Sequence, residues 1–340
     1  MKAVVLGSGG WGTALALVLC DNGHETWLWS HNAEKAAQMR TSRENPLLKG
    51  VKLPETLKIT DDISCVRDAD LVVSASPSFA VRATAKKAAE FLRPETVLVS
   101  VSKGIERDTE LRMSQIVQQE TENKCKVVAL SGPSHAEEVG IRMPTGCVAA
   151  CAEESVAKFV QDAFMNHYFR IYTSPDIVGV ELCGALKNVV ALSCGISDGM
   201  GFQDNTKALL MTRAMVEIAN LGEKLGGSRQ TFGGLAGMGD LIVTCTSMHS
   251  RNRRAGILIG QGKSAQEAMD EVGAVVEGYY AAASVEQLAV REDIEMPICH
   301  CAFEVLYHDK PVQEVVKELM TRAKKGEIEH GWVYPQEFFD

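Results

Sequence analysis

The strongest fold signal in the chain is the amino-terminal sequence Lys2-Ala-Val-Val-Leu-Gly-Ser-Gly-Gly-Trp-Gly12. An apolar, β-branched run breaks here into the pattern Gly7-x-Gly9-x-x-Gly12. An apolar helix over Thr13–Cys20 and a second strand over Glu25–Trp29 are predicted to follow at once. A strand, a glycine turn, a helix and a strand within ~30 residues form the context in which this pattern binds a dinucleotide. The alternative is an ordinary glycine-rich turn of another α/β protein.

Each glycine of the pattern has a physical role. Gly7 permits the tight turn, Gly9 lets the backbone approach a pyrophosphate, and Gly12 lets helix and strand pack closely. The helix amino terminus offers unpaired N–H groups and a partial positive charge to phosphates. The second strand ends in Trp29-Ser-His-Asn32, without the acid that usually binds the adenosine ribose of NAD. We therefore expect NADP or NAD, with NADP at least as good a fit as NAD.

Composition limits the possible functions. The chain has 340 residues, enough for two domains and a large core, with 46% apolar and 23% charged residues. Its formal net charge of -9 argues against a nucleic-acid or membrane-surface partner. If the ligand is an anion, positive charges must gather locally in a cleft.

The cysteines and the apolar stretches indicate a cytoplasmic protein. The ten cysteines include no Cys-x-x-Cys pair, so we expect reduced thiols. We interpret Cys299-His300-Cys301 as core residues, with no metal site, because no second ligand pair lies at zinc-site spacing. No signal peptide is visible before the glycine pattern. Polar residues interrupt the apolar stretch Val178–Cys194, which predicts a core helix with no stable membrane insertion.

The hydrophobic pattern predicts two domains. Strands alternate with helices such as Phe79–Leu92 and Leu111–Thr121, and the remaining predicted strands are Leu71–Ala75, Thr96–Val101, Val127–Ser131, Gly146–Ala150 and Tyr168–Tyr172. Beyond Pro175, seven helices are predicted, over Asp176–Cys194, Asn205–Leu225, Ser250–Gly260, Ser264–Val272, Gly278–Arg291, Pro297–Leu306 and Pro311–Ala323. The prediction is an α/β fold: a doubly wound Rossmann-type domain over 1–173 and an all-α substrate domain over 174–326. The tail 327–340, with four aromatic residues, is either disordered or docked in an aromatic groove.

Polar side chains follow two predicted strands, where ligands of open α/β sheets bind. Thr96–Val101 leads into Ser102-Lys103-Gly104, and Val127–Ser131 leads into Gly132-Pro-Ser134-His-Ala136. Lys103 supplies a cation, while Gly132 and Ser134 supply backbone and hydroxyl donors. Alternatively, Lys103 is a solvated loop lysine.

Lys187 lies in the middle of an apolar helix, with Cys183 and Ala191 one turn away on each side. Burial there disfavours the ammonium and lowers the pKa toward the range of a general base. Gly184 thins the same helix where a ligand or another backbone can approach. The alternative is a lysine that extends along the helix to solvent.

A third group of polar residues surrounds Asp240 and Ser250. Asp240 stands among glycines, and Ser250 is a suitable N-cap for the following helix. Arg251 and Asn252 then occupy its first turn, where a basic residue opposes the helix dipole. A bound anion such as phosphate would resolve this conflict. The alternative is a basic turn that pairs with nearby acids.

Together these motifs closely resemble the family of bacterial NAD(P)-dependent glycerol-3-phosphate dehydrogenases. The resemblance runs from the first strand to about Lys325, in the family's order, through Gly7–Gly12, Ser102–Gly104, Ser131–Ser134, Lys187-Asn188, Gly239–Leu241, Ser250–Arg254 and Val275–Gly278. It implies a 6-phosphogluconate-dehydrogenase-like helical domain and a homodimer. It also implies interconversion of dihydroxyacetone phosphate and sn-glycerol 3-phosphate, which feeds phospholipid synthesis.

The resemblance also implies residue roles. Lys187 looks like the proton donor and acceptor. Substrate contacts look like Lys103, Gly132, Ser134, Lys187, Asp240, Ser250, Arg251 and Asn252. Cofactor contacts look like Gly7, Gly9, Gly10, Trp11, Gly12, His31, Lys103, Ala136, Arg251, Val275 and Glu277. One departure is visible, because the family often has serine where this chain has Gly10, so a hydroxyl contact to the pyrophosphate is lost.

Two other functions fit parts of the pattern. A related β-hydroxyacid dehydrogenase, acting on 6-phosphogluconate or ketopantoate, would share the fold and the lysine, but Ser250–Arg254 weighs against the unphosphorylated ketopantoate. A non-catalytic NADP(H)-binding redox sensor would not need Lys103 and Lys187 together with an anion site. The sequence leaves the cofactor preference, any feedback control and the subunit count open.

Overall fold

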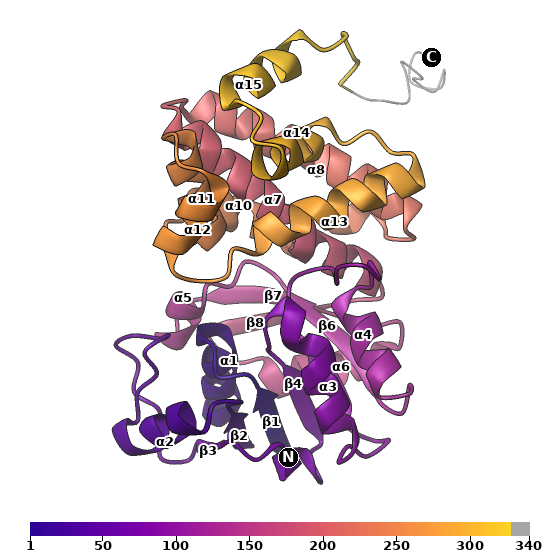
Figure 1. The fold of residues 1–340 in the computed structure, drawn as a ribbon. Coiled ribbons are helices and arrows are strands. Elements are labelled where there is room, and N and C mark those ends of the chain that lie inside the picture. Colours follow the sequence, from indigo (N-terminus) through magenta and orange to yellow (C-terminus); the bar gives the residue numbers. More distant parts are fainter. Residues whose placement is uncertain (328–340) are drawn as a thin grey trace.

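The computed structural model describes residues 1–327, so nearly all of the predicted tail 327–340 lies outside the described residues. A sheet flanked by helices forms the first half of the chain, and a group of helices above it forms the second half (Figure 1). This arrangement confirms the predicted fold class.

The sheet has eight strands in the order β3-β2-β1-β4-β5-β6-β7-β8. Neighbouring strands are parallel except β6 and β7, which pair antiparallel. The strands are β1 (Lys2–Leu6), β2 (Glu25–Trp29), β3 (Lys58–Thr60), β4 (Leu71–Ser74), β5 (Val97–Ser100), β6 (Lys126–Ser131), β7 (Thr145–Ala150) and β8 (Phe169–Ser174).

Helices cover both faces of this sheet. In β1, Ala3 and Val5 belong to one core with α1 and α6, while Val4 and Leu6 belong to a second core with α3 and α4. This alternation explains the continuous apolar runs, because such strands are buried on both faces. The helices are α1 (Gly10–Asp21), α2 (Ala33–Ser42), η1 (Ile63–Val66), η2 (Ser78–Ala80), α3 (Val81–Ala89), α4 (Met113–Glu120), α5 (Ala136–Gly140) and α6 (Glu154–Phe164).

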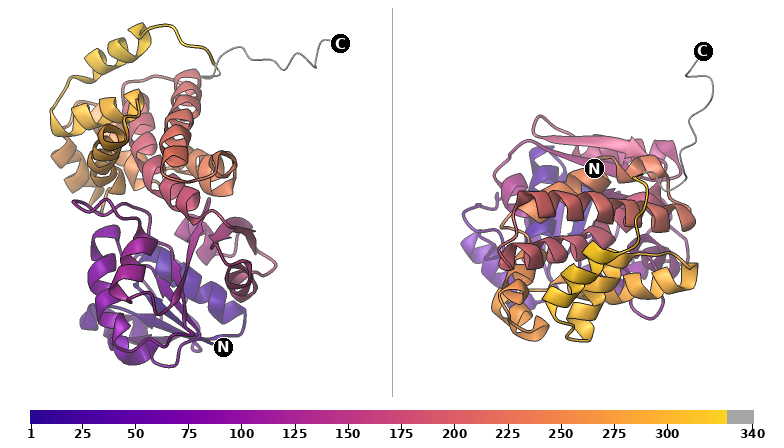
Figure 2. Two further views of the ribbon diagram at one scale, coloured as in Figure 1. Left: turned by 90° about the vertical axis from the view of Figure 1, so that its right-hand side faces the viewer. Right: turned by 90° about the horizontal axis from the view of Figure 1, so that it is seen from above.

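The second half contains helices and no strand among its described residues (Figure 2), and α7 (Ile177–Gly199) contacts most of these helices. Its elements are α7 (Ile177–Gly199), α8 (Asp204–Lys224), α9 (Arg229–Phe232), the π-helix η3 (Leu235–Gly239), α10 (Asp240–Thr246), α11 (Arg251–Gly260), α12 (Ala265–Val272), α13 (Glu277–Glu292), α14 (Pro297–Tyr307) and α15 (Val312–Thr321).

Helix α7 is long and apolar enough to cross a membrane, but 78% of its most apolar window is buried inside the protein. It is therefore a core helix, as its interrupting polar residues predict. It packs tightly against α11, because a Cβ at Gly195 would lie 2.2 Å from the Arg253 carbonyl oxygen and one at Gly256 would lie 2.1 Å from that of Leu192. This close packing fixes the start of α11 beside the middle of α7.

The sequence predictions are incomplete at several elements. They give no bounds for the helices α2 and α6, and they lack the three-residue strand β3 and the short helices α9 and α10. The predicted helix Phe79–Leu92 is also too long, because a 3₁₀ turn precedes α3 and the helix ends at Ala89. The elements β3, α9 and α10 carry too few residues for a periodic signal. All ten cysteines are free, and eight are buried.

Candidate active site

The glycine turn between β1 and α1 has the geometry that its sequence predicts. Gly7 has a φ of +131°, and a Cβ there would lie 2.6 Å from the Ala75 carbonyl oxygen. A Cβ at Gly12 would lie 2.0 Å from the Gly7 carbonyl oxygen, so helix and strand meet here. At Gly9, in contrast, no described atom lies within 4 Å of the added carbon. The turn is thus open at Gly9, where a pyrophosphate fits against the backbone.

The structure explains why this chain has glycine at position 10, where the family often has serine. A Cβ at Gly10 would lie 2.7 Å from the Leu47 carbonyl oxygen and 3.5 Å from the Cβ of Ala136. A serine would therefore require the backbone around Leu47 to move. Ala136 lies beside the turn, as predicted. The ring of Trp11 is 6.4 Å from that of Phe169, so its indole packs toward the core.

The end of β2 lies beside the same turn. The Ser8 hydroxyl donates to the buried Ser30 hydroxyl at 2.9 Å, and the Asn32 side chain caps α2. His31 is exposed. Lys35 donates to the Ser8 carbonyl oxygen at 2.6 Å, and burial lowers the pKa of its ammonium. A cation therefore lies where an acid usually binds a ribose.

Asp240 joins the two predicted lysines, one from each half of the chain. Its Oδ2 is 2.5 Å from Lys103 Nζ, and its Oδ1 is 3.0 Å from Lys187 Nζ. Lys103 also donates to the Gly132 carbonyl oxygen at 3.2 Å, and Lys187 donates to Thr244 Oγ1 at 2.5 Å. The loop after β5, the loop after β6 and helices α7 and α10 thus meet at one point.

Burial sets the chemistry of this group. Lys187 and Asp240 are 5% and 1% exposed. Burial is the main cause that lowers the pKa of Lys187, the Asp240 carboxylate opposes it and the neighbouring Lys103 adds to it, and the resulting pKa is about 8. Such an amine can release and accept a proton near neutral pH. A Cβ at Gly184 would lie 3.3 Å from Lys103 Cγ, so the absence of a side chain there makes room for Lys103.

The loop after β6 lies beside Lys103, Lys187 and Asp240, and Lys103 contacts its Gly132. The Ser134 hydroxyl donates to the Gly132 carbonyl oxygen at 3.0 Å. A Cβ at Gly132 would lie 2.8 Å from the Gly146 carbonyl oxygen, so only glycine fits there. His135 is a residue that the sequence analysis did not single out. Burial lowers the pKa of its imidazole, and the nearby Lys187 charge adds to the shift.

The first turn of α11 contains three of the predicted residues in different environments. Ser250 caps the helix by accepting from the Arg253 backbone N–H at 3.2 Å, and Arg251 is exposed. Asn252 is buried, and its amide donates to Asn188 Oδ1 at 3.0 Å and accepts from the Gly278 backbone N–H at 2.8 Å. Asn252 is thus already bonded to protein groups and has one amide hydrogen left for a ligand.

Glu277 connects the two halves of the chain at a second point, through Ser78. Its carboxylate accepts from the Ser78 hydroxyl at 2.7 Å and from the Ser78 backbone N–H at 3.4 Å. Burial raises the pKa of Glu277. A Cβ at Gly104 would lie 3.7 Å from the Glu277 carboxylate, so this residue reaches the loop that carries Lys103. Val275 is half-buried in the segment before α13.

The sequence analysis did not identify Thr244 and His135 as residues of the site, because both lie in or beside short helices. Thr244 accepts from Lys187, and its hydroxyl also donates to the Asp240 carbonyl oxygen at 2.6 Å. The spacing of four between Asp240 and Thr244 places them on one face of a helix, but no helix was predicted there. His135 precedes the five-residue helix α5, which is shorter still than the seven-residue α10.

Among the described residues, no three His, Cys, Asp or Glu side chains gather in the way a metal site needs. Cys299 and Cys301 are buried in α14, while His300 Nδ1 lies 2.9 Å from Glu286. The Cys299-His300-Cys301 sequence thus belongs to the helical core and its edge.

Known proteins share both the sequence and the fold. The family model described as NAD-dependent glycerol-3-phosphate dehydrogenase N-terminus matches residues 2–157, and the corresponding C-terminus model matches residues 176–317. Glycerol-3-phosphate dehydrogenase [NAD(P)+] of Moorella thermoacetica is 51% identical over 329 residues, 96% of this chain and 98% of the relative. The enzyme of the same description from Bacillus subtilis is 48% identical over 332 residues, 96% of each chain.

Solved structures agree with these sequence matches. The glycerol-3-phosphate dehydrogenase of Coxiella burnetii superposes with a TM-score of 0.90 at 35% identity, covering 94% of this chain and 99% of that one. A ketopantoate reductase of Ralstonia eutropha, at 15% identity and a TM-score of 0.62, shares the fold alone over 94% of this chain and all of its own. The chain therefore belongs to the family of NAD(P)-dependent glycerol-3-phosphate dehydrogenases.

Proposed function

We propose that this chain interconverts dihydroxyacetone phosphate and sn-glycerol 3-phosphate, with Lys187 as the residue that gives and takes the proton. The observation that carries the proposal is the buried Lys187 ammonium, held by Asp240 and Thr244 where the two halves of the chain meet. A lysine with a pKa of about 8 is suited to this role, because both of its protonation states are populated near neutral pH. The product supplies phospholipid synthesis in the cytoplasm.

The open glycine turn supports binding of a nicotinamide dinucleotide, which when bound supplies or accepts the hydride. The open backbone at Gly9, the start of α1 at Gly10 and the adjacent Ala136 would hold the pyrophosphate. Trp11 would contribute its backbone N–H, since its indole packs toward the core. Lys103, Arg251, Val275 and Glu277 would line the remainder. His31 and Lys35, with no acid at the end of β2, support use of NADP as well as NAD.

Lys187 and Lys103 divide the work at the reacting oxygen. When the ketone is reduced, negative charge develops on the former carbonyl oxygen, and the Lys187 ammonium protonates it. The Lys103 ammonium stabilises the same charge in a site shielded from water. Asp240 fixes both amines by accepting one hydrogen bond from each, and its charge keeps Lys187 protonated in a larger fraction of the molecules.

The substrate phosphate would bind at the start of α11. Free N–H groups at the helix amino terminus favour an anion, and the exposed Arg251 guanidinium offers a two-pronged donor. Ser250 and Asn252 hold this turn in place, because each bonds to the backbone of the same helix or of α13. Gly132 and Ser134 would contact the other end of the substrate.

A spectrophotometric assay tests the function. Addition of dihydroxyacetone phosphate to the protein with NADPH should cause a loss of NADPH absorbance, and a parallel assay with NADH determines the preference. Ketopantoate and 6-phosphogluconate (with oxidised cofactor) should give no turnover. Binding of NADPH without consumption of dihydroxyacetone phosphate would instead support a redox sensor. We also propose a homodimer, which sedimentation equilibrium tests.

A further inference from the structure

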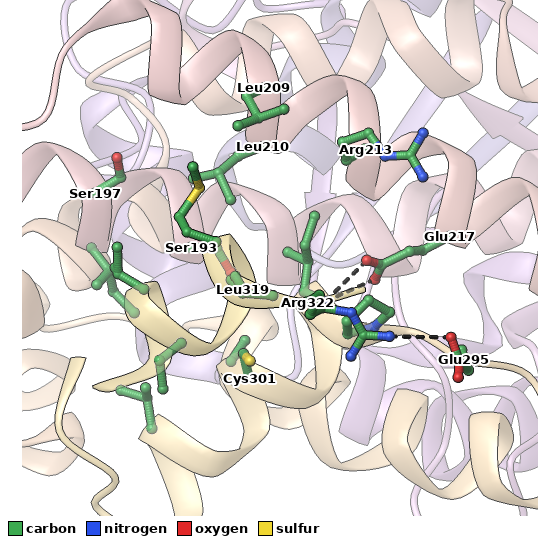
Figure 3. Close-up of a pocket in the computed structure, with 18 of the residues that line it drawn as sticks. Ser193, Ser197, Leu209, Leu210, Arg213, Glu217, Glu295, Cys301, Leu319 and Arg322 are labelled. Carbon is green, nitrogen blue, oxygen red and sulfur yellow. Dashed lines mark hydrogen bonds and ion pairs between the residues drawn. The ribbon is translucent and has the colours of Figure 1, made fainter. Parts of the chain in front are cut away.

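A large cavity lies under α15, between this helix, α14, the later turns of α7 and the length of α8. Its volume is about 660 Å³, within the range of pockets that enclose a whole ligand. Apolar side chains dominate its wall, among them Leu209 and Leu210 from α8 and Leu319 from α15 (Figure 3). The cavity contains none of the residues around Lys187, and the proposed reaction does not use it.

Helix α15 is poorly covered by the described residues. Val315 is its one buried residue, although Val312, Val316 and Leu319 also face the cavity. Met320, at its end, is 69% exposed. Protein interiors are close-packed, and an apolar surface of this size is normally covered. Residues 1–327 thus leave an apolar groove beneath α15 that another segment can fill.

We propose that residues 328–340 of the same chain fold back into this groove and bury aromatic side chains there. The chain leaves α15 along the groove, because Arg322, Ala323 and Lys325 belong to its wall. The segment that follows contains the aromatic residues Trp332, Tyr334, Phe338 and Phe339. Each such side chain can bury ~150–250 Å² of surface, so two or three suffice to cover the groove.

The segment is long enough to fill the groove. Thirteen extended residues span up to ~43 Å, whereas the part of α8 that lines the groove, Thr206 to Lys224, spans ~27 Å at helical rise. Charges of both signs line the rim, including Lys224 and Asp293, so apolar burial supplies the attraction. Because the segment begins at the rim, its local concentration exceeds that of any second copy.

Trp332 makes the proposal testable in the full chain. The other three tryptophans, Trp11, Trp27 and Trp29, lie in the sheet half, so the difference between wild type and Trp332→Phe isolates the Trp332 fluorescence. We expect a blue-shifted Trp332 emission that acrylamide quenches weakly. Leu209→Lys, at a groove residue that is 49% exposed, should increase the quenching constant several-fold. Val290→Lys, at a 74% exposed apolar residue of α13 outside the groove, is the matched control and should leave it unchanged.

Met320→Lys is a second groove variant, which keeps the test valid if Leu209→Lys does not fold. All three lysine variants should keep wild-type turnover, which shows that they fold. Three results would overturn the proposal. The first is a freely quenched Trp332 in the wild type. The second is a shielded Trp332 that neither groove variant exposes. The third is shielding lost on dilution in step with dimer dissociation, because the segment then occupies the groove of the other copy.

Discussion

The Lys187 ammonium lies 3.0 Å from one carboxylate oxygen of Asp240, while the other oxygen of the same carboxylate contacts Lys103. Lys187 comes from the longest helix of the second half, and Lys103 comes from a loop at the edge of the sheet. One nearly inaccessible carboxylate thus joins the two halves of the chain at the site of proton transfer.

The rate should depend on pH with opposite signs in the two directions. Reduction requires protonated Lys187, so kcat should fall as pH rises through about 8. Oxidation requires neutral Lys187, so kcat should rise toward pH 8 and level off above it. Initial rates in both directions over a pH series check this, with cofactor and substrate saturating at each pH. A kcat that changes with pH in the same sense in both directions would contradict the assignment of Lys187.

Asp240→Asn should move this titration to lower pH. The Asp240 charge raises the pKa of Lys187 against burial, so its removal lets burial and Lys103 depress the pKa further. We expect the falling limb of the reduction profile to shift to the acid side. Asp198→Asn is the matched control, because Asp198 pairs with Arg253 and Lys207 and should affect stability without moving the limb. If kcat for reduction falls at the same pH in the wild type and in Asp240→Asn, Asp240 does not set the pKa of Lys187.

Arg251→Ala should weaken binding of the phosphorylated substrate. Loss of a charge-assisted hydrogen bond of ~1.5–3 kcal/mol should lower kcat/KM by ~10-fold to ~150-fold, mainly through KM. Arg253→Ala provides the comparison, because Arg253 donates to Asp198 and to the Thr246 carbonyl oxygen. That variant should lower Tm and leave KM close to wild type. A raised KM in Arg253→Ala and an unchanged KM in Arg251→Ala would place the phosphate contact on Arg253 instead of Arg251.

Lys35→Glu should change the cofactor preference. A carboxylate beside the Ser8 carbonyl, near the end of β2, would repel the 2′-phosphate of NADPH and resemble the acid that binds the ribose of NAD. The ratio of kcat/KM for NADPH to that for NADH should fall by ~10-fold or more. Lys35→Gln separates charge from size and should give an intermediate ratio. An unchanged ratio in both variants would exclude Lys35 from cofactor selection.

Hydrophobic periodicity and motif spacing predict the long, regular elements of this molecule and the surroundings of individual residues within them. The apolar runs at β4, β5 and β6 identify strands buried on both faces, and the apolar neighbours of Lys187 predict its lowered pKa. The contacts of Asp240 could not be predicted, because they join residues from three distant segments. Periodicity also cannot tell Arg251 from Arg253. Only the packing of α11 against α7 leaves the first exposed and pairs the second with Asp198.

The central claim is that Lys187 transfers the proton, and single-turnover reduction by Lys187→Ala tests it most directly. Enzyme and NADPH are mixed with saturating dihydroxyacetone phosphate, and NADPH binding is measured separately by fluorescence. We predict a rate lower by ~10²-fold to ~10⁴-fold, the usual contribution of a general acid, with a nearly unchanged Kd for NADPH. A single-turnover rate close to that of the wild type would contradict the assignment of Lys187.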